Sequence, residues 1–590
     1  MRRAFSALLA VIMSLSLFPT AILADGTATA VRNDAVIEID GVRSYVEAYV
    51  IGGNNYFKLR DLALALNGTA KQFEVTWDET KKAVNLLRGK PYTPDGSELS
   101  SAYDPTPKAA ALSTAKIYLD HEEIRVTAYA IGGYNYFKLR DLAAALNIYL
   151  RWDAAAGEIK IDTLFPYVPD GAGSSYAFRS DVSVANTMRA FRDRWASISS
   201  VQQFPYKNEG LAYAYVQDGR LIIVTPGKEL SVDMLYPELG DVIADEDGNF
   251  YVIWGRDNRR DGEIVETVFV SKYSPEGAHI KTTGFVGESK PWGSSDAAKT
   301  KVPFRHGNSV SAIGNGILVN YHTKQRYDGH QSDNVIAVRL SDLSPYELPN
   351  NTYSGHSFNQ SVIYSKKLSD FLFASQGDAY PRGFRVNDSS GRYGDKDDLT
   401  FTFYLEPNAD YNMYIVNETF AQLGGIVETS KGVALVGASA KSIGEAAKTE
   451  KQNLFVQIFD PLAPKRSPSA YIGGTARSGA TSYDIYDNQN APLTNVTDYG
   501  VIWLTDYTDR NVITPQVVAA DDRIVILWKE DVGSPVDTYY MVLSAEGNVI
   551  KPKTPLGLPL NSFEQPIYHD GRVYWAYALR GKLAVASFEP

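Results

Sequence analysis

The stretch DGNFYVIW at residues 247–254 decides the fold, because similar stretches recur along the C-terminal two-thirds of the chain. Each combines an acidic or Asp-Gly turn with a strongly apolar run that follows it. The other copies are DGRLIIV (218–224), DDRIVILW (521–528) and DGRVYW (570–575). Asp-Gly pairs favour tight hairpin turns, and short apolar runs bounded by turns are typical of buried strands. The pattern predicts a series of antiparallel hairpins.

A second turn type completes two of these units. It reads SPEG at residues 274–277 and SAEG at residues 544–547, each time after a Tyr- and Val-rich strand. Together the two turns describe a four-stranded meander. More degenerate units fit residues 308–345, 356–387, 425–461 and 499–514.

A four-stranded sheet of this kind cannot bury both of its faces alone, and radial repetition into a β-propeller solves the problem. About 380 residues at roughly 45–55 per blade give about seven blades over residues 201–590. The last unit has only about three strands, so we predict that a strand from the N-terminal edge of this domain completes it and closes the ring. Two β-sandwiches in series are the competing architecture.

The composition agrees with a large, mainly β, globular protein. Of 590 residues, 44% are hydrophobic and 22% charged. The chain has 38 Tyr against 6 Met, and aromatic rings pack well on pleated sheets. Its net charge of −11 argues against nucleic acid as a partner, since phosphate binding needs a basic footprint.

The first 24 residues have the form of a signal peptide. Arg2 and Arg3 precede an apolar stretch, residues 4–18, that is short for a membrane helix, and Leu23-Ala24 offers a small-residue cleavage site. A retained membrane anchor is the alternative. The chain has no cysteine, which suits an exported bacterial protein that relies on large cores. We therefore expect a secreted or cell-surface protein with no membrane span after signal removal.

Before the β-rich region the chain contains an internal repeat. YVEAYVIGGNNYFKLRDLALALN (45–67) and RVTAYAIGGYNYFKLRDLAAALN (125–147) are identical at 18 of 23 positions. In each copy we expect two strands, a glycine turn, a short amphipathic helix and a last pair of strands that carries a Trp-Asp dipeptide. Each copy is predicted to be a small α+β domain, at residues 31–90 and 115–163, with a solvated linker at 91–114.

This order of elements around the FKLRDL core resembles the copper amine oxidase N-terminal-like, or stalk, domain. The resemblance implies an exported protein of a Gram-positive bacterium in which the two modules act as spacers. The chain has no His-x-His pair and no Asn-Tyr-Asp/Glu tyrosine context, so copper chemistry and a cofactor are not expected. Arg60 and Arg140 are expected to tie each helix to its sheet.

Residues 164–200 are predicted to be a linker and a helix. Within it, residues 184–198 place Met188, Phe191, Trp195 and Ile198 at three- and four-residue spacing, which is the period of a helix.

One polar cluster is the candidate site. Segments of neighbouring predicted blades contain three of the seven histidines, an aspartate, an arginine and several amides. Equivalent loops of a propeller converge at one face, so we expect these side chains to lie close together. The cluster consists of His322, His330, Gln331, His356, Asn359, Asp378, Tyr380 and Arg382. It predicts a polar binding site or a metal site; the alternative is that these side chains satisfy loop backbone groups between blades. The acidic residues 245–249 could also be interpreted as a calcium loop. The stretch is short for one, and we expect a hairpin turn there instead.

Two functions fit these features. The first is a non-catalytic surface or secreted protein whose propeller binds a glycan, a peptide or a protein partner of the cell wall or extracellular space. The second is a secreted hydrolase or lyase that acts on polysaccharide. No nucleophile elbow, P-loop or HExxH motif is present, which favours the first.

Overall fold

The computed structural model describes the greater part of residues 27–590, in two compact units, Met1–Pro169 and Asp170–Pro590. The described residues are 27–98, 104–153, 157–163, 167, 175–179, 181–189, 196–260, 263–287, 296–349, 356–377, 382–390, 399–404, 419–443, 445–463, 468–480, 495–531, 538–579 and 581–590. The predicted signal peptide lies outside them. No helix in these ranges is long and apolar enough to cross a membrane.

The N-terminal unit contains two short helices and twelve strands among its described residues. They are β1 (Thr27–Ile39), β2 (Val42–Ile51), β3 (Asn54–Lys58), α1 (Leu59–Ala65), β4 (Phe73–Asp78), β5 (Ala83–Arg88), β6 (Lys108–Leu112), β7 (Ile117–Leu119), β8 (Glu122–Ile124), β9 (Ala128–Ile131), β10 (Tyr134–Lys138), α2 (Leu139–Leu146), β11 (Tyr149–Asp153) and β12 (Glu158–Asp162).

Strands from both copies of the repeat share two sheets. The larger has the order β11-β12-β1-β2-β3-β10-β9-β6, and the smaller has the order β4-β5-β7-β8. At the junction of the copies Phe57 pairs with Phe137, and both side chains are buried in one core. The sequence predicts two separate modules. In the structure β3 of the first copy pairs with β10 of the second, so the two copies share one sheet and neither strand is left as an exposed edge.

The segment predicted as a solvated linker is partly built into this unit. Tyr92 is buried, and the Asn67 side chain brackets it, donating to its carbonyl and accepting from its N–H. Strand β6 pairs with β1. Arg60 reaches this segment, where its guanidinium lies 2.8 Å from a carboxylate oxygen of Asp95. Arg60 therefore ties its helix to the connecting chain.

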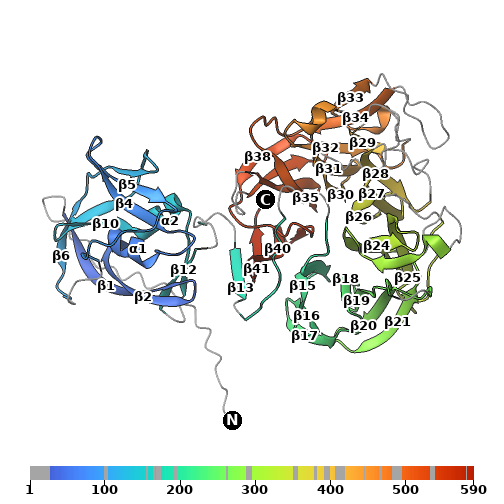
Figure 1. Cartoon of the computed structure of the whole chain (residues 1–590), viewed down its shortest axis with the longest axis horizontal. Coiled ribbons are helices and arrows are strands. Elements are labelled where there is room, and N and C mark those ends of the chain that lie inside the picture. Colours follow the sequence, from blue (N-terminus) through green and yellow to red (C-terminus); the bar gives the residue numbers. More distant parts are fainter. Residues whose placement is uncertain are drawn as a thin grey trace, which may run out of the picture. The chain divides into compact units, whose positions relative to one another are not determined.

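The C-terminal unit consists of seven described sheets that follow one another along the chain and are arranged around a ring (Figure 1). The first sheet contains β14 (Val201–Tyr206), β15 (Gly210–Gln217), β16 (Arg220–Thr225) and β17 (Lys228–Asp233), and the second contains β18 (Glu238–Ala244), β19 (Phe250–Gly255), β20 (Val268–Tyr273) and β21 (His279–Phe285). The third contains β22 (Thr300–Pro303), β23 (Ser309–Gly314), β24 (Ile317–Arg326) and β25 (Gln331–Arg339), the fourth β26 (Ser357–Ser365), β27 (Asp370–Gly377), β28 (Arg382–Asp388) and β29 (Leu399–Tyr404), and the fifth β30 (Gln422–Glu428), β31 (Val433–Ser439), β32 (Asn453–Phe459), β33 (Thr475–Ala480) and β34 (Asn495–Trp503). The sixth contains β35 (Val512–Ala520), β36 (Arg523–Glu530), β37 (Thr538–Ser544) and β38 (Val549–Pro555), and the seventh contains β39 (Ile567–His569), β40 (Arg572–Leu579) and β41 (Lys582–Phe588), joined by β13 (Ser175–Arg179). Short 3-10 turns lie at Asp296–Ala298, Glu445–Lys448 and Pro468–Ala470.

This arrangement is a β-propeller, and the mainly β fold class is confirmed. The innermost strands of successive sheets contact one another in turn, and β39 and β40 contact the first sheet again. In order, these strands are β14, β18, β23, β26, β30, β35 and β39. We number the sheets as blades 1 to 7. The Asp-Gly turns lie where they are predicted, with Asp570 and Gly571 both at positive φ between β39 and β40. Trp254, Trp528 and Trp575 are fully buried on the second strands of their blades.

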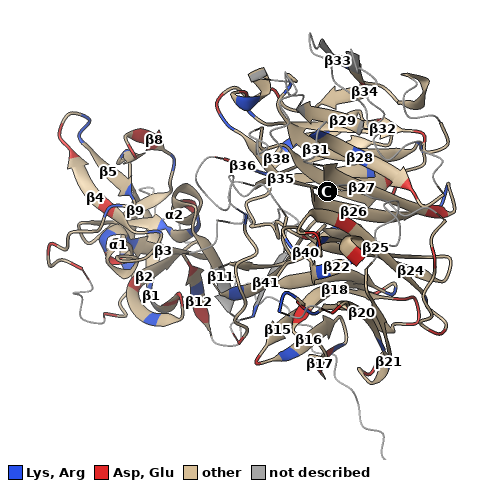
Figure 2. Cartoon of the chain, turned by 45° about the vertical axis from the view of Figure 1, so that its right-hand side comes forward, with Lys and Arg blue, Asp and Glu red and all other residues tan. Residues whose placement is uncertain are grey.

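Acidic and basic residues are interspersed over the blades (Figure 2). The turn at residues 245–249 is a hairpin turn, in which the Asp245 carboxylate accepts hydrogen bonds from the Asn249 backbone and side chain. Its oxygens are therefore used within the turn, and the calcium interpretation is not supported.

The ring closes as the sequence predicts. Strand β13 pairs antiparallel with β41, so residues that precede blade 1 supply the fourth strand of blade 7. Val201 and Tyr215 of blade 1 pack against Ala576 and Leu583 of blade 7 across this seam.

The helix predicted at residues 184–198 is wrong for the part that the structure describes. Residues 182–189 and 196–199 have no helical structure, and Phe191 and Trp195 lie outside the described residues. The backbone here bonds to the blades instead. The Thr187 N–H donates to the carbonyl of Ala578 in blade 7, and the Ala196 N–H donates to the carbonyl of Phe358 in blade 4. These bonds replace the i to i−4 bonds of a helix.

Loss of the closing strand will destabilise the propeller. Proline at both Tyr176 and Ala177 removes whichever of the two N–H groups bonds to β41, and we expect a loss of about 1–3 kcal/mol in the free energy of unfolding from the unpaired β41 carbonyl. Threonine at the same two positions keeps both N–H groups and should lose less stability than the proline variant. Equal unfolding midpoints for the two variants in denaturant titrations would show that β13 does not hold the ring.

Candidate functional site: the central cavity

The strands that face the centre of the ring are irregular. Pairing shifts by one or more residues between Leu239 and Asp241 in β18, and β26, β30 and β35 have similar shifts. A bulge of this kind leaves backbone groups without partners in the ladder. At Gly240 the bulge also brings two blades close, since a Cβ there would lie 2.4 Å from the Phe304 ring.

Amide side chains of neighbouring blades satisfy the freed backbone groups. The Gln376 amide of blade 4 donates to the Ala421 carbonyl at 2.8 Å and accepts from the Leu423 N–H at 3.2 Å, both in blade 5. Gln565 does the same for blades 5 and 6, where it bonds to Gly424 O and Val517 N. The further bridges of this type are Gln203 to blade 7, Asn308 to blade 4, Asn359 to blade 5, Gln422 to blade 6 and Gln516 to blade 7.

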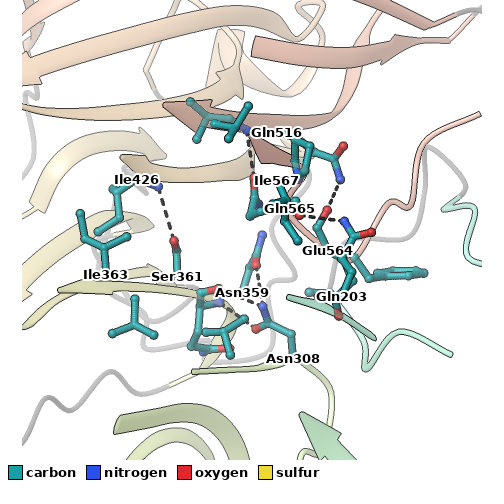
Figure 3. Close-up of a pocket in the computed structure, with 18 of the residues that line it drawn as sticks. Gln203, Asn308, Asn359, Ser361, Ile363, Ile426, Gln516, Glu564, Gln565 and Ile567 are labelled. Atoms are coloured by element: carbon teal, nitrogen blue, oxygen red, sulfur yellow. Dashed lines mark hydrogen bonds between the residues drawn. The ribbon is translucent and has the colours of Figure 1, made fainter. Parts of the chain in front are cut away.

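A cavity of about 430 Å³ lies between the inner strands of all seven blades. Figure 3 shows the amides Asn308, Asn359, Gln516 and Gln565 around it, with aliphatic side chains such as Ile363 between them. Its volume is within the range of about 300–1,000 Å³ that is typical of small-molecule sites. Apolar walls with a few polar groups are also the usual lining of such sites.

Three polar atoms in the cavity lining have no hydrogen-bond partner among the described residues. They are Oε1 of Gln360, Nε2 of Gln422 and Oγ1 of Thr514, and each of these residues is at least 97% buried. Buried polar groups are nearly always paired, and an unpaired one costs about 1–3 kcal/mol. These three atoms have almost no accessible surface, so they lie within the wall and do not face the cavity.

Two carboxyl groups also line the cavity. Asp241 accepts from the hydroxyl and N–H of Ser311, and Glu564 accepts from the N–H of Gln203. Burial raises the pKa of Asp241 from 3.8 to about 7, although these hydrogen bonds lower it. Burial, and then the nearby Asp241 charge, raise the pKa of Glu564 well above its ordinary value. The two groups thus act on each other across the cavity.

His322, a member of the sequence-predicted cluster, has a structural role. It is fully buried; its Nδ1 lies 2.8 Å from Asn320 Oδ1, and its Nε2 lies 3.2 Å from Asn334 Nδ2. Burial, and then the Lys324 charge, lower the pKa of its imidazole to about 3. The histidine thus bonds to two side-chain amides of its own blade, and no hydrogen bond among the described residues joins it to a loop backbone group between blades.

His330, His356 and Arg382 do come together. The two imidazole rings have centroids 6.4 Å apart, and burial, then His330 and Arg382, lower the pKa of His356. Gln331 lies beside them and bonds to the backbone of Ser357. Asp378 and Tyr380 lie outside the described residues. Among the residues that the structure does describe, no group of three His, Asp or Glu side chains is placed to hold a metal ion.

Asn359 lines the central cavity (Figure 3), whereas the His-His-Arg group does not. The Asn359 side chain accepts a hydrogen bond from Asn308 and donates one to the Leu423 carbonyl. The candidate cluster therefore divides into a buried histidine, a His-His-Arg group and one cavity amide. Sequence reasoning missed Asp241, Gln360, Gln422, Thr514 and Glu564. Asp241 and Thr514 had a local signal, an adjacent Gly240 or Pro515 inside an apolar strand, because Gly and Pro in strands mark bulges. The other three residues have no Gly or Pro beside them.

No family model and no curated protein sequence matches the chain. Solved structures that resemble it include the β-propeller domain of the Trilobed protease from Pyrococcus furiosus, with 9% identity, a TM-score of 0.34, and coverage of 67% of this chain and 96% of that one. The soluble aldose sugar dehydrogenase from Escherichia coli has 8% identity, a TM-score of 0.31, and coverage of 70% and 100%. A Hadza microbial sialidase has 9% identity, a TM-score of 0.29, and coverage of 74% of each chain.

Removing one bridging amide will weaken the ring. Gln376→Met keeps the side-chain volume but leaves Ala421 O and Leu423 N–H unpaired in a buried place, so we expect a loss of about 2–4 kcal/mol in unfolding free energy. Gln325→Met, at an exposed amide bond, is the matched control and should change stability by less than about 0.5 kcal/mol. Equal denaturation midpoints for the two variants would contradict the role of the bridge.

Ionisation of Asp241 opposes folding. The folded protein keeps this proton up to about pH 7, whereas the unfolded chain releases it near pH 3.8, so stability falls as the pH rises between these values. Asp241→Asn should flatten this fall by up to about 4 kcal/mol, measured by denaturant unfolding at pH 4.5 and pH 8. Asp247→Asn, at an exposed residue of the next turn, should keep the wild-type slope. A wild-type slope in Asp241→Asn would show that this carboxyl ionises normally.

Proposed function

We propose that this protein is a non-catalytic, secreted or cell-surface binding protein whose propeller takes the end of a glycan into its central cavity. The observation that carries the proposal is a central cavity of about 430 Å³ whose wall combines amide and aliphatic side chains. Sugar hydroxyls both donate and accept, so a ring with several hydroxyls suits a wall that carries amides such as Asn359 and Gln565. The aliphatic side chains between them suit the C–H faces of the same ring.

The N-terminal unit has a supporting role in this proposal. Its two repeats resemble stalk domains, and the chain begins with a signal-like sequence, so the propeller would be held away from a Gram-positive cell surface. The glycan would then come from the cell wall or the extracellular space.

A hydrolase or lyase of polysaccharide is the second candidate. Asp241 and Glu564 favour it, because glycosidases use two carboxyl groups, one of them with a raised pKa. Release of reducing ends from cell-wall and plant glycans by the full-length protein would establish this function in place of simple binding.

Filling the cavity will abolish binding. Ser361 lines it (Figure 3), and Ser361→Phe places a ring inside, whereas Ser231→Phe places the same ring on an exposed outer strand. We expect the wild-type chain and Ser231→Phe to bind a subset of glycans on an array of cell-wall and plant oligosaccharides, and Ser361→Phe to bind none. Thermal unfolding checks that both variants are folded. Absence of any glycan ligand, or binding that survives in folded Ser361→Phe, would overturn the proposal.

A further inference from the structure

The lining of the central cavity changes character along the inner strands. On four of them a polar lining residue comes first and an aliphatic one follows. In chain order these pairs are Asp241 and Ile243 on β18, Asn359 and Ile363 on β26, Gln422 and Val427 on β30, and Gln516 and Ala519 on β35. The chain that leads into β39 has the same order, with Ser562 and Gln565 before Ile567, whereas on β23 Ser311 follows Val310.

Neighbouring inner strands run in the same direction, so the polar residues gather at one height. The Asn359 side chain of blade 4 donates to the Leu423 carbonyl at 2.9 Å. The Gln565 side chain of blade 7 donates to the next carbonyl, that of Gly424, at 2.8 Å. Asn359 and Gln565 therefore lie at the same height in the ring, although they come from distant blades (Figure 3).

The aliphatic residues gather further along the same strands. Two residues after Asn359, the Ser361 hydroxyl accepts from the Ile426 N–H at 3.4 Å, and Ile363 and Val427 follow. Val427 lies three residues beyond Gly424, roughly 10 Å at about 3.3 Å per residue of strand. The cavity thus has two levels. We define the polar level by Asn359, Ser562 and Gln565, and the apolar level by Ile243, Ile363, Val427 and Ala519.

Both levels present surface to a molecule in the cavity, since none of these seven residues is fully buried. The amide nitrogens of Asn359 and Gln565 each carry two N–H groups, and one from each is used in the bridge between blades. The second N–H of each amide can therefore bind a ligand hydroxyl. The apolar level offers hydrocarbon surface only.

The chain segment before blade 1 lies at the polar level. The Arg189 N–H donates to the Ser562 hydroxyl at 3.0 Å, and the Ala196 N–H donates to the carbonyl of Phe358, next to Asn359, at 3.2 Å. Arg189 and Ala196 both line the cavity. Their backbone occupies space at the polar level, which favours entry of a ligand from the apolar level, with its polar part first.

We propose that the cavity binds an amphiphilic glycoside, with its sugar at the polar level and a hydrocarbon group attached to that sugar at the apolar level. A sugar alone leaves water on the aliphatic side chains, and a hydrocarbon alone leaves the amide N–H groups without acceptors. This inference rests on the proposed glycan function and narrows the ligand class to sugars linked to hydrocarbon. Such a ligand is either a free glycoside or a glycolipid of a membrane.

The test compares the hexyl and methyl β-glycosides of glucose, galactose and N-acetylglucosamine on the full-length protein by titration calorimetry. We expect at least one hexyl glycoside to bind at least about tenfold more tightly than the methyl glycoside of the same sugar, because its additional methylene groups enter the apolar level. 1-Hexanol should bind more weakly than that hexyl glycoside.

The double variant Ile363→Thr/Val427→Thr places hydroxyl groups at the apolar level and should remove the preference for hexyl glycosides. Val549→Thr/Ile550→Thr is the matched control, because it makes the same two changes at residues of the outer strand β38 that are 53% and 56% exposed. It should keep the preference. Thermal unfolding checks that both variants are folded, and Val427→Thr alone is the milder variant, which should at least halve the preference.

The outcomes separate this inference from the proposed function. A glycan ligand on the array, together with hexyl glycosides that bind no more tightly than methyl ones, overturns the amphiphilic ligand and leaves glycan binding intact. A preference that survives in the folded apolar-level variants, or 1-hexanol that binds as tightly as the hexyl glycosides, also overturns it. If the array detects no ligand and no glycoside binds, both proposals fail.

Vesicles separate the two sources of such a ligand. Binding to phosphatidylcholine vesicles that contain a glycosyl diacylglycerol, but not to plain ones, assigns the site to a membrane glycolipid. Binding of the hexyl glycosides without binding to either vesicle assigns it to a free glycoside.

Discussion

Side-chain amides that reach from one blade to the backbone of the next are the interaction on which the propeller depends. The bulges at the centre break the ladder bonds of the inner strands, and each freed N–H or C=O would be costly if it stayed unpaired. Glutamine carries a donor and an acceptor in one planar group, so Gln376 can satisfy both an N–H and a C=O of its neighbour. The amides therefore bind the blades together, and the space between them becomes a cavity with polar walls.

Much of this fold is predictable from local sequence. Asp-Gly turns followed by apolar strands specify hairpins by themselves, and a last blade that lacks one strand requires a partner from elsewhere in the chain. The non-helical backbone in the described part of residues 184–198 was not predictable in this way. The helical spacing of its apolar residues competes with hydrogen bonds to Ala578 and Phe358 that exist only in the closed ring. The pairing of β3 with β10 is likewise a contact between distant residues, which the similarity of the two repeats does not reveal.

The site was harder to predict than the fold. Histidines attract attention because they are rare, yet His322 is a buried neutral group between two amides. The residues of the cavity wall are common ones, and Asp241 and Glu564 are more than three hundred positions apart in the sequence. Their proximity follows from the closure of the ring, and their raised pKa values follow from burial that no local pattern encodes. Only the Gly and Pro residues that mark the bulges gave a local signal.

The position of β13 also determines when, during synthesis, the ring of blades can close. Its partner β41 ends two residues before the last residue of this sequence, whereas β13 is made before any other part of the ring. During synthesis, β13 must therefore wait for almost the entire propeller before it finds a strand to pair with. A chain that stops before residue 582 lacks that strand altogether, and its first and last blades keep their seam surfaces open. Ring closure thus acts as a built-in check that translation has passed β41.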